Sequence, residues 1–183
     1  MSSALQHRFI LTGGPGSGKS TIVDAIIKRG FWSSKEAGRG VIQDQVNIGG
    51  DALPWANQTA FAELMLSWEM RSWHEAEGQT KPCFFDRGVP DVVGYLRLSG
   101  LNVPSHLENA IEKFRYNPTV FIAPPWRDIY VQDKERKQAF DIAIETYNAM
   151  MKTYREYDYR LIELPCVSVE DRVDFILSTI QSL

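Results

Sequence analysis

Residues 13–20 constrain this chain more than any other segment, because Gly-Gly-Pro-Gly-Ser-Gly-Lys-Ser matches G-x-x-x-x-G-K-[ST] at every fixed position. Glycines let a loop turn its backbone N–H groups inward around the oxygen atoms of a phosphate. The apolar segment 8–12 precedes this loop as a candidate strand, and residues 21–29 follow it as an amphipathic helix that ends at Gly30. A strand, a glycine loop and a helix in this order predict a phosphate-binding loop, or P-loop.

The individual residues of the P-loop have separate predicted tasks. Lys19 is expected to reach the β- and γ-phosphates of a nucleoside triphosphate, and the hydroxyl of Ser20 to bind Mg²⁺. The helix N-terminus behind the loop adds unpaired N–H donors and a partial positive charge. The expected nucleotide-binding residues of this segment are Gly13, Gly14, Pro15, Gly16, Ser17, Gly18, Lys19, Ser20 and Thr21. No motif selects the base, so ATP with Mg²⁺ is the expected cofactor and GTP stays open.

Composition limits the partners that the chain is expected to have. With 183 residues, of which 44% are hydrophobic and 23% charged, it is typical of one globular domain, residues 1–183. The net charge of −3 and the lack of a long basic run argue against a dedicated nucleic-acid binder. Cys83 and Cys166 have no metal-type spacing, which favours a reducing, cytoplasmic location. The sequence has no signal-peptide pattern and no apolar run of membrane-spanning length, so no membrane partner is expected.

Apolar strand candidates alternate with helical patterns along the chain, which predicts an α/β fold with a mostly parallel sheet and helices on both faces. The expected strands are 8–12, 30–35, 82–86, 119–123 and 159–164. The expected later helices are 57–77, one opened by Ser105 with Glu108 as a capping box, 137–158, and one that starts at 168–171. Phe61, Leu64, Met65, Trp68 and Ser72 are expected to share one face of the helix 57–77. Residues 37–55 contain four glycines and a proline, and are expected to be irregular apart from a short helix at 41–46.

Asp86 and Arg87 form the second informative feature. Asp86 ends a short apolar strand, and ligands of an open parallel sheet bind at the carboxyl ends of its strands. A carboxylate at this position is suited to hold Mg²⁺, directly or through water. Arg87 offers a planar fork of donors for a phosphate or a carboxylate. The alternative is an ordinary strand-ending acid followed by a surface arginine.

Glu36 and Arg39 follow the second expected strand and should therefore face the same edge of the sheet. Glu36 is expected to take a proton from a substrate hydroxyl that attacks the γ-phosphate, and Arg39 to orient that substrate. A salt bridge on a surface loop is the alternative for this pair. Trp55 is a candidate for stacking on a planar substrate, although a large aromatic side chain is also typical of a core.

Charged residues follow the fourth expected strand, and we expect the segment 124–138 to act as a lid. Pro124 and Pro125 prevent a helix from starting at once, and a charged stretch then leads into the next helix. Arg127 and Arg136 are expected to close over the triphosphate and stabilise its developing charge. The alternative is a solvated helix face.

The order of these parts resembles, over nearly the whole chain, the P-loop kinase class of nucleoside and nucleotide kinases. More narrowly, the motifs resemble a group of small AAA-like predicted ATPases that are similar to the ribosylnicotinamide kinase domain of bifunctional NAD regulators. These motifs are Glu-x-x-Arg at 36–39, Phe-Phe-Asp-Arg-Gly at 84–88, Pro-Asp at 90–91, Pro-Pro-Trp at 124–126 and Asp-x-x-Arg at 133–136. The resemblance implies a three-layer P-loop NTPase fold with a five-stranded parallel sheet in the order 2-3-1-4-5. It also implies that Asp86 matches the acid of the Asp-Arg or Glu-Arg-Ser motifs of such kinases, and that Glu36 stands where deoxynucleoside kinases place their catalytic base.

Taken together, the sequence predicts a Mg²⁺-dependent phosphotransferase that moves the γ-phosphate of ATP to a small, nucleoside-like or nucleotide-like metabolite. The expected catalytic residues are Lys19, Glu36, Asp86, Arg87 and Arg136. Ser20 and Asp86 are the expected metal ligands, Arg127 an additional nucleotide contact, and Glu36, Arg39, Arg87 and Trp55 the expected acceptor contacts. The alternative is a nucleotide-dependent switch or regulatory NTPase that presents the loop 37–56 to a protein partner. A polynucleotide end kinase is a third hypothesis, which the negative net charge opposes. The identity of the acceptor and the oligomeric state stay open.

Overall fold

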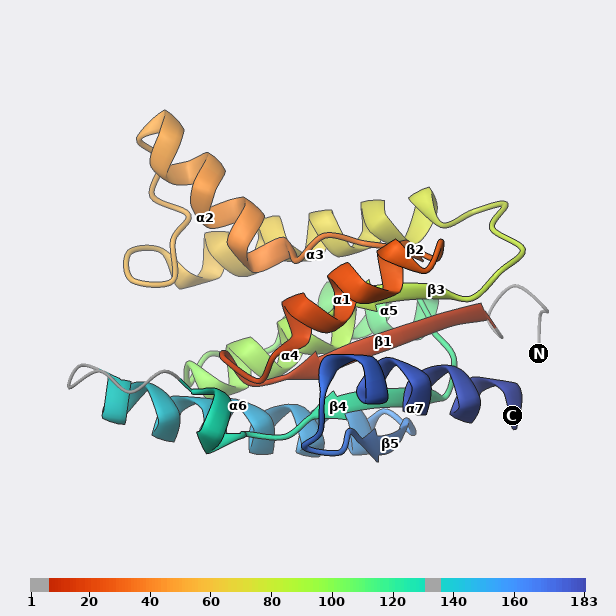
Figure 1. The fold of residues 1–183 in the computed structure, drawn as a ribbon. Helices are drawn as coiled ribbons and strands as arrows, with labels where there is room; N and C mark the ends of the chain where they lie inside the picture. Colours follow the sequence, from red (N-terminus) through yellow and green to blue (C-terminus); the bar gives the residue numbers. More distant parts are fainter. Residues whose placement is uncertain (1–6, 131–135) are drawn as a thin grey trace.

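The computed structural model describes residues 7–130 and 136–183, with residues 136–139 described by their backbone alone. Its strands are β1 (Arg8–Gly13), β2 (Trp32–Ser33), β3 (Cys83–Asp86), β4 (Thr119–Ala123) and β5 (Arg160–Glu163). They form one sheet in the order β2-β3-β1-β4-β5, and every neighbouring pair is parallel (Figure 1). The predicted strand order is therefore confirmed. β2 is shorter than predicted because only Trp32 and Ser33 pair with β3 at this edge of the sheet.

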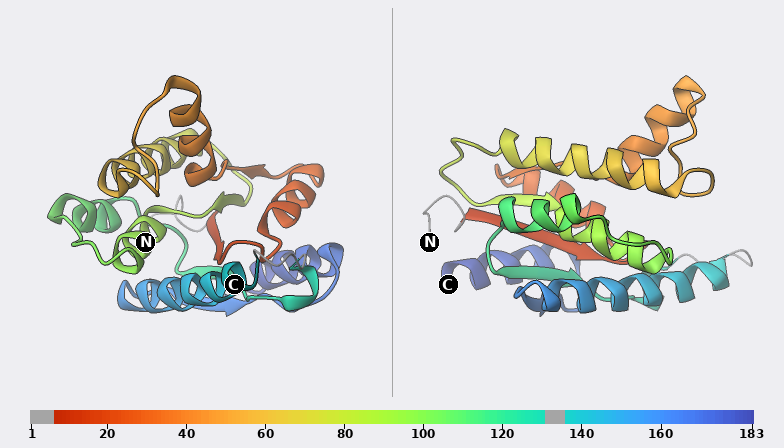
Figure 2. Two further views of the ribbon diagram at one scale, coloured as in Figure 1. Left: turned by 90° about the vertical axis from the view of Figure 1, so that its left-hand side faces the viewer. Right: turned by 180° about the vertical axis from the view of Figure 1, so that it is seen from behind.

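Helices cover both faces of the sheet (Figures 1 and 2). They are α1 (Lys19–Lys28), α2 (Ala37–Ile48), α3 (Gln58–Glu75), α4 (Val89–Leu98), α5 (Ser105–Lys113), α6 (Arg136–Glu156) and α7 (Val169–Gln181), with a short 3₁₀ helix, η2 (Arg127–Ile129). The carboxyl ends of the strands, the start of α1 and the projecting α2 lie at the left of Figure 1, and the start of β1 and the end of α7 lie at the right. None of the helices in the described ranges is long and apolar enough to cross a membrane.

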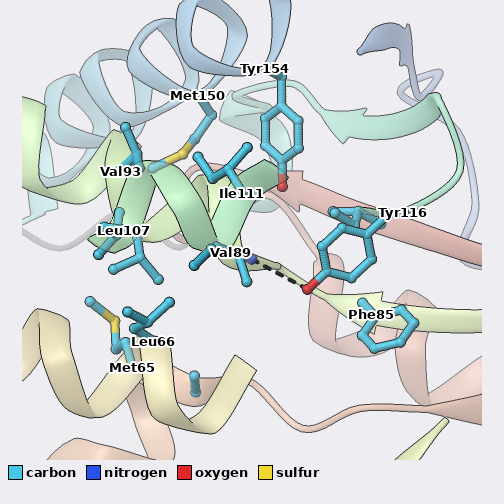
Figure 3. Packing of buried hydrophobic residues seen from close by; sticks show 14 of the residues in the cluster. Met65, Leu66, Phe85, Val89, Val93, Leu107, Ile111, Tyr116, Met150 and Tyr154 are labelled. Carbon is cyan, nitrogen blue, oxygen red and sulfur yellow. Dashed lines mark hydrogen bonds between the residues drawn. The ribbon is translucent and has the colours of Figure 1, made fainter. Parts of the chain in front are cut away.

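Two hydrophobic clusters, one on each face of the sheet, hold the layers together. Successive strand residues point to opposite faces, so Phe9 and Phe84 pack with α1 and α7, whereas Ile10 and Phe85 pack with α3 to α6. Figure 3 shows side chains of α3, α4, α5 and α6 meeting in the second cluster. Because both faces are covered, the central strands are buried at every position, as a parallel sheet requires.

The segment 37–55 departs most from the prediction, because twelve of its residues form the regular helix α2 rather than an irregular loop with a short helix at 41–46. Two of the four glycines that suggested a loop, Gly38 and Gly40, are contact positions of this helix. A Cβ atom at Gly40 would collide with the ring of Trp68 on α3, and one at Gly38 would touch the sulfur of Met65. Glycine is therefore used here for close helix packing, which a local reading of the sequence does not distinguish from a loop.

Smaller corrections concern helix ends and faces. α4 was not predicted as a helix, although Pro90 lies in its first turn, where proline is tolerated. Ser105 is already helical and follows the N-cap residue Pro104, so the predicted capping box at Ser105 is wrong. On α3, Leu64 is exposed and Glu69 is buried, so the buried face is rotated from the predicted one. The start of α7 was predicted correctly, because the Ser168 hydroxyl accepts a hydrogen bond from the Asp171 N–H at 3.2 Å.

Candidate functional site

The P-loop joins β1 to α1 as a tight turn. Gly16 and Gly18 have φ values of 69° and 81°, a left-handed conformation that glycine adopts without steric cost. A side chain at Gly16 would also collide with the Tyr130 ring. The Ser17 hydroxyl donates to the Gly14 carbonyl at 2.8 Å and closes the turn. The loop therefore has the shape that its sequence predicted.

Lys19 folds back over the loop that precedes it. Its Nζ atom donates to the carbonyl oxygens of Gly14 at 2.9 Å and Gly13 at 3.2 Å, and the residue is 7% exposed. Burial and, to a smaller extent, the positive charge of Arg87 together lower the pKa of Lys19 to about 7, although the carboxylate of Asp86 opposes this shift. Within the described residues, the hydrogen-bond partners of this Nζ atom are neutral, so an anion bound in the loop would supply the counter-charge that the ammonium group lacks.

Asp86 lies at the carboxyl end of β3, beside the P-loop strand. Its backbone N–H donates to the Ser34 hydroxyl at 3.0 Å, which joins the end of β3 to the end of β2. The residue is 5% exposed, and within the described residues its Oδ1 atom has no hydrogen-bond partner. Burial raises the pKa of Asp86, while the charges of Lys19 and Arg87 oppose this shift. An orphaned carboxylate oxygen at this depth fits a hard cation such as Mg²⁺.

Arg87 adopts a backbone conformation that is costly for an arginine. Its φ is 74°, and a non-glycine residue in this region costs on the order of 1–3 kcal/mol. The backbone is held by a hydrogen bond from the Arg87 N–H to the Leu11 carbonyl at 3.0 Å. The side chain is held by Asp91, whose Oδ1 lies 3.2 Å from Nη1. Such strain is retained where the surrounding structure enforces it, and it places this guanidinium beside the P-loop.

Asp91 is the buried anchor that positions Arg87. It accepts hydrogen bonds from the hydroxyl groups of Thr12 and Tyr154, both at 2.5 Å, and from the Gly88 N–H at 2.9 Å. These donors come from β1, α6 and the start of α4, so one carboxylate ties three elements together. Tyr154 therefore has a polar contact in addition to its packing in the hydrophobic cluster.

Glu36 lies between two arginines at the start of α2. Its carboxylate oxygens lie 3.6 Å from Nε of Arg87 and 4.0 Å from Nε of Arg39. The salt bridge of Glu36 with Arg39, which was the alternative for this pair, is present at this longer distance. The closer contact with Arg87 was not predicted. The two acid–arginine pairs of the sequence analysis are thus parts of one cluster.

A cavity of about 550 Å³ joins this cluster to the P-loop. Residues 15–21 line it, together with Glu36, Arg39 and Arg87, which come from the β2 and β3 side. Trp126, Ile129, Val167, Val169 and Arg172 line it from the β4 and β5 side. Since β1 lies between β3 and β4 in the sheet, the P-loop stands between a charged part of the cavity and a largely apolar part.

Six predicted site residues are not among the residues described as lining this cavity: Gly13, Gly14 and Asp86, whose surroundings are given above, and three others. Trp55 is 68% exposed and does not line it, so its role in stacking stays a prediction. Arg127 is exposed on η2, with its guanidinium 4.7 Å from the centre of the Phe140 ring. Arg136 begins α6, but its side chain lies outside the described residues, as does the whole segment 131–135 of the predicted lid.

Besides Asp91, the buried charged residues that the sequence analysis did not single out include one on α7 and one on α3. Arg172 on α7 and Glu69 on α3 are 1% and 2% exposed. Burial raises the pKa of Glu69 well above its usual value, and the carboxylates of Asp91 and Asp86 add to this shift. Each residue interrupts the apolar face of its helix. A charged residue at a position where the amphipathic pattern expects an apolar one is the sequence feature that could have identified Arg172 and Glu69.

Comparisons with known proteins agree with the fold described above. A family model described as AAA domain matches residues 8–172. A structure of deoxyadenosine kinase from M. mycoides with the products dCMP and a flexible dCDP bound has a TM-score of 0.56 and 18% sequence identity, and the match covers 96% of this chain and 100% of that one. A second structure of that kinase, with bound dATP, has a TM-score of 0.53 and 17% identity, and covers 96% and 99% of the two chains. No curated protein sequence matches the chain. The likeness to the solved structures shows a P-loop kinase fold.

Proposed function

The chain belongs to the AAA domain family, and on this premise we propose that it is a phosphotransferase that moves the γ-phosphate of a nucleoside triphosphate to a small, nucleoside-like or nucleotide-like metabolite. One observation carries the proposal. Glu36 and Arg87 line the same cavity as Lys19 and the P-loop, so a carboxylate and a guanidinium lie together where a phosphate acceptor would have to approach. A loop that only bound nucleotide would not require this cluster.

The residues would act mainly by position and charge, because phosphoryl transfer asks for little covalent chemistry from the protein. The P-loop N–H groups and Lys19 would hold the β- and γ-phosphates, and Arg87 would neutralise charge that develops on the transferred group. Glu36 would take the proton of an acceptor hydroxyl as its oxygen bonds to the γ-phosphorus. The bond from that phosphorus to the bridging oxygen would then break and leave a nucleoside diphosphate. Arg39 would orient the acceptor.

Ser20 and Asp86 would hold Mg²⁺ at this site. The fit rests on the buried Oδ1 atom of Asp86, which has no hydrogen-bond partner within the described residues, and on Ser20 among the residues that line the cavity. The ion supplies charge neutralisation on the phosphate oxygens when it is bound. ATP is the proposed first donor, and the bound ligands named for the M. mycoides kinase structures support a nucleoside-like acceptor.

The test is transfer of label from γ-labelled ATP, with Mg²⁺, to a panel of nucleosides, nucleoside monophosphates and nicotinamide riboside. Label should appear in one acceptor class with the wild-type chain and be lost in Lys19→Ala. Glu36→Gln should reduce transfer, whereas Glu75→Gln, the matched change at an exposed salt bridge on α3, should not. Transfer that survives Lys19→Ala would show that the reaction takes place elsewhere.

A nucleotide-dependent switch is the second candidate, and the surface of α2 favours it. Val46 and Ile48 on α2 are 58% and 73% exposed, and Trp55 follows them in the next loop, so an apolar surface stands beyond Glu36. A protein that binds such a surface would bring partner recognition close to the nucleotide. In that case Glu36→Gln would leave nucleotide affinity and slow phosphate release unchanged, and no small acceptor would be labelled.

A further inference from the structure

A second cavity lies at the β2 edge of the sheet, and the proposed phosphoryl transfer does not use it. Its volume is about 540 Å³, which is in the usual range for a small-molecule site. Residues 32–35 of the sheet edge form one side, and side chains of α2 and α3 form the rest (Figure 1). In the described part of the chain, no residue lines both this cavity and the P-loop cavity, so the two are separate sites.

Two tryptophan side chains, Trp32 and Trp68, line this cavity, and both are half-buried. The Trp32 ring packs edge-on against Phe85, with 5.3 Å between the ring centres. The Trp68 ring lies against α2 at Gly40, where a Cβ atom would come within 2.4 Å of it. Because neighbouring elements hold both indoles in place, the cavity has preformed walls for a flat aromatic group.

Two serines, Ser34 and Ser72, are the most deeply buried residues that line the cavity, at 5% and 4% exposed. The Ser34 hydroxyl accepts a hydrogen bond from the Asp86 N–H at 3.0 Å. Within residues 7–130 and 136–183, its proton has no acceptor and the Ser72 hydroxyl has no partner. Buried hydroxyl groups without partners are unfavourable, so a ligand group that both donates and accepts would be stabilising at this end of the cavity.

Two opposite charges stand unpaired at the mouth of the cavity. Lys35 at the β2 edge and Asp44 on α2 are exposed, and neither forms an ion pair or a side-chain hydrogen bond with a described residue. The other two charged residues of the lining, Arg71 and Glu75, pair with each other at 2.9 Å. A ligand with a single charge would face a like charge here, whereas a zwitterion would match both.

We propose that this second cavity binds an amino acid with a hydroxylated aromatic side chain, of the tyrosine type. Its carboxylate would pair with Lys35 and its ammonium group with Asp44. Its ring would pack on the two tryptophans, and its phenol would exchange hydrogen bonds with the two buried serine hydroxyls. The ligand is not the phosphate acceptor, because the cavity is separate from the P-loop, and the inference therefore goes beyond the proposed function.

The experiment is equilibrium dialysis of labelled L-tyrosine against the full chain, with unlabelled analogues as competitors. Tyramine lacks the carboxylate, 3-(4-hydroxyphenyl)propionate lacks the ammonium group, and L-phenylalanine lacks the phenol hydroxyl. Each analogue should bind about three- to tenfold more weakly than L-tyrosine, as expected for the loss of one hydrogen-bonded contact. L-Leucine keeps both charges but lacks the ring, and it should not compete at tenfold excess over L-tyrosine.

Variants at the mouth assign each charge contact to its residue. In Lys35→Gln, L-tyrosine and tyramine should bind within about twofold of each other, because the carboxylate has lost its partner. In Asp44→Asn, L-tyrosine and the propionate should bind within about twofold of each other for the same reason. Lys28→Gln and Asp24→Asn are the matched controls on the exposed surface of α1, and they should keep the wild-type ratios. Thermal unfolding checks that all four variants are folded.

Three results would overturn the proposal. The first is that labelled L-tyrosine does not bind to the wild-type chain. The second is that tyramine or the propionate competes as well as L-tyrosine, which would remove the recognition of a zwitterion. The third is that the wild-type ratios persist in folded Lys35→Gln and Asp44→Asn, which would place any binding outside this cavity. All three leave the proposed function standing, because its test depends on residues of the P-loop cavity.

Discussion

Nucleotide affinity should depend on pH through Lys19. Burial lowers the pKa of this ammonium group to about 7 in the free protein, whereas a bound polyphosphate would raise it by adding negative charge. Binding is therefore accompanied by proton uptake wherever Lys19 is neutral beforehand. Affinity should be highest below pH 7 and should fall as the pH rises through 7, until the pKa of the complex is reached.

The size of the effect follows from the pKa. A group with a pKa of about 7 is about nine-tenths protonated at pH 6 and about one-tenth protonated at pH 8. If only the charged form binds the phosphates, the dissociation constant of a nucleoside diphosphate should rise about tenfold between these two pH values. At pH 8 each binding event should take up about 0.9 proton.

Calorimetry in buffers of different ionisation enthalpy measures both quantities on the same samples. GDP and ADP serve as probes, and their own phosphates titrate as well, so the control must share that contribution. Lys19→Arg provides it, because its guanidinium stays protonated over this range. The difference in pH slope between the wild type and Lys19→Arg isolates Lys19. Equal slopes, with no additional proton uptake by the wild type, would refute the reasoning that burial has neutralised this lysine.

Three further outcomes are expected from the rest of the site. The free energy of unfolding, measured in urea, should be about 1 kcal/mol higher for Arg87→Gly than for Arg87→Ala, because glycine adopts a φ of 74° without strain. Equal free energies of unfolding would mean that this conformation carries no strain. Tyr154→Phe should lose about 1–3 kcal/mol of stability by removing a donor from buried Asp91, and an unchanged urea midpoint would contradict this. The melting temperature of Asp86→Asn should be no lower than that of the wild type, because the substitution removes a buried carboxylate with a raised pKa. In calorimetry, however, Mg²⁺ should no longer tighten nucleotide binding by this variant.

The sequence was sufficient for the features that depend on neighbouring residues. The P-loop, the strand 119–123 and the cap at Ser168 are local patterns, and the structure contains all three. The strand order was implied by a resemblance to P-loop kinases and is confirmed. The meeting of Lys19, Glu36 and Asp86 at one edge then follows, because parallel strands end on the same side of a sheet.

Local patterns were insufficient where a residue is used by a distant partner. Gly38 and Gly40 were interpreted from the sequence as loop residues. In the structure they lie on α2 against Met65 and Trp68 of α3. Glycine has a low intrinsic helix propensity, so the local sequence argues against a helix here. Only the tertiary structure shows that the missing side chains allow α2 to pack closely on α3.

What the sequence by itself determined is therefore the phosphate-binding loop, the alternation of strands and helices, and the set of charged residues that follow the strands. The tertiary structure decided which of those charges share a cavity and which buried groups position them. Asp91 finds its donors in Thr12 and Tyr154, 79 and 63 residues away along the chain, and Arg172 finds the Ser17 carbonyl at a separation of 155. Contacts at such separations depend on how complete helices pack against the sheet, and no local pattern of residue types encodes that packing.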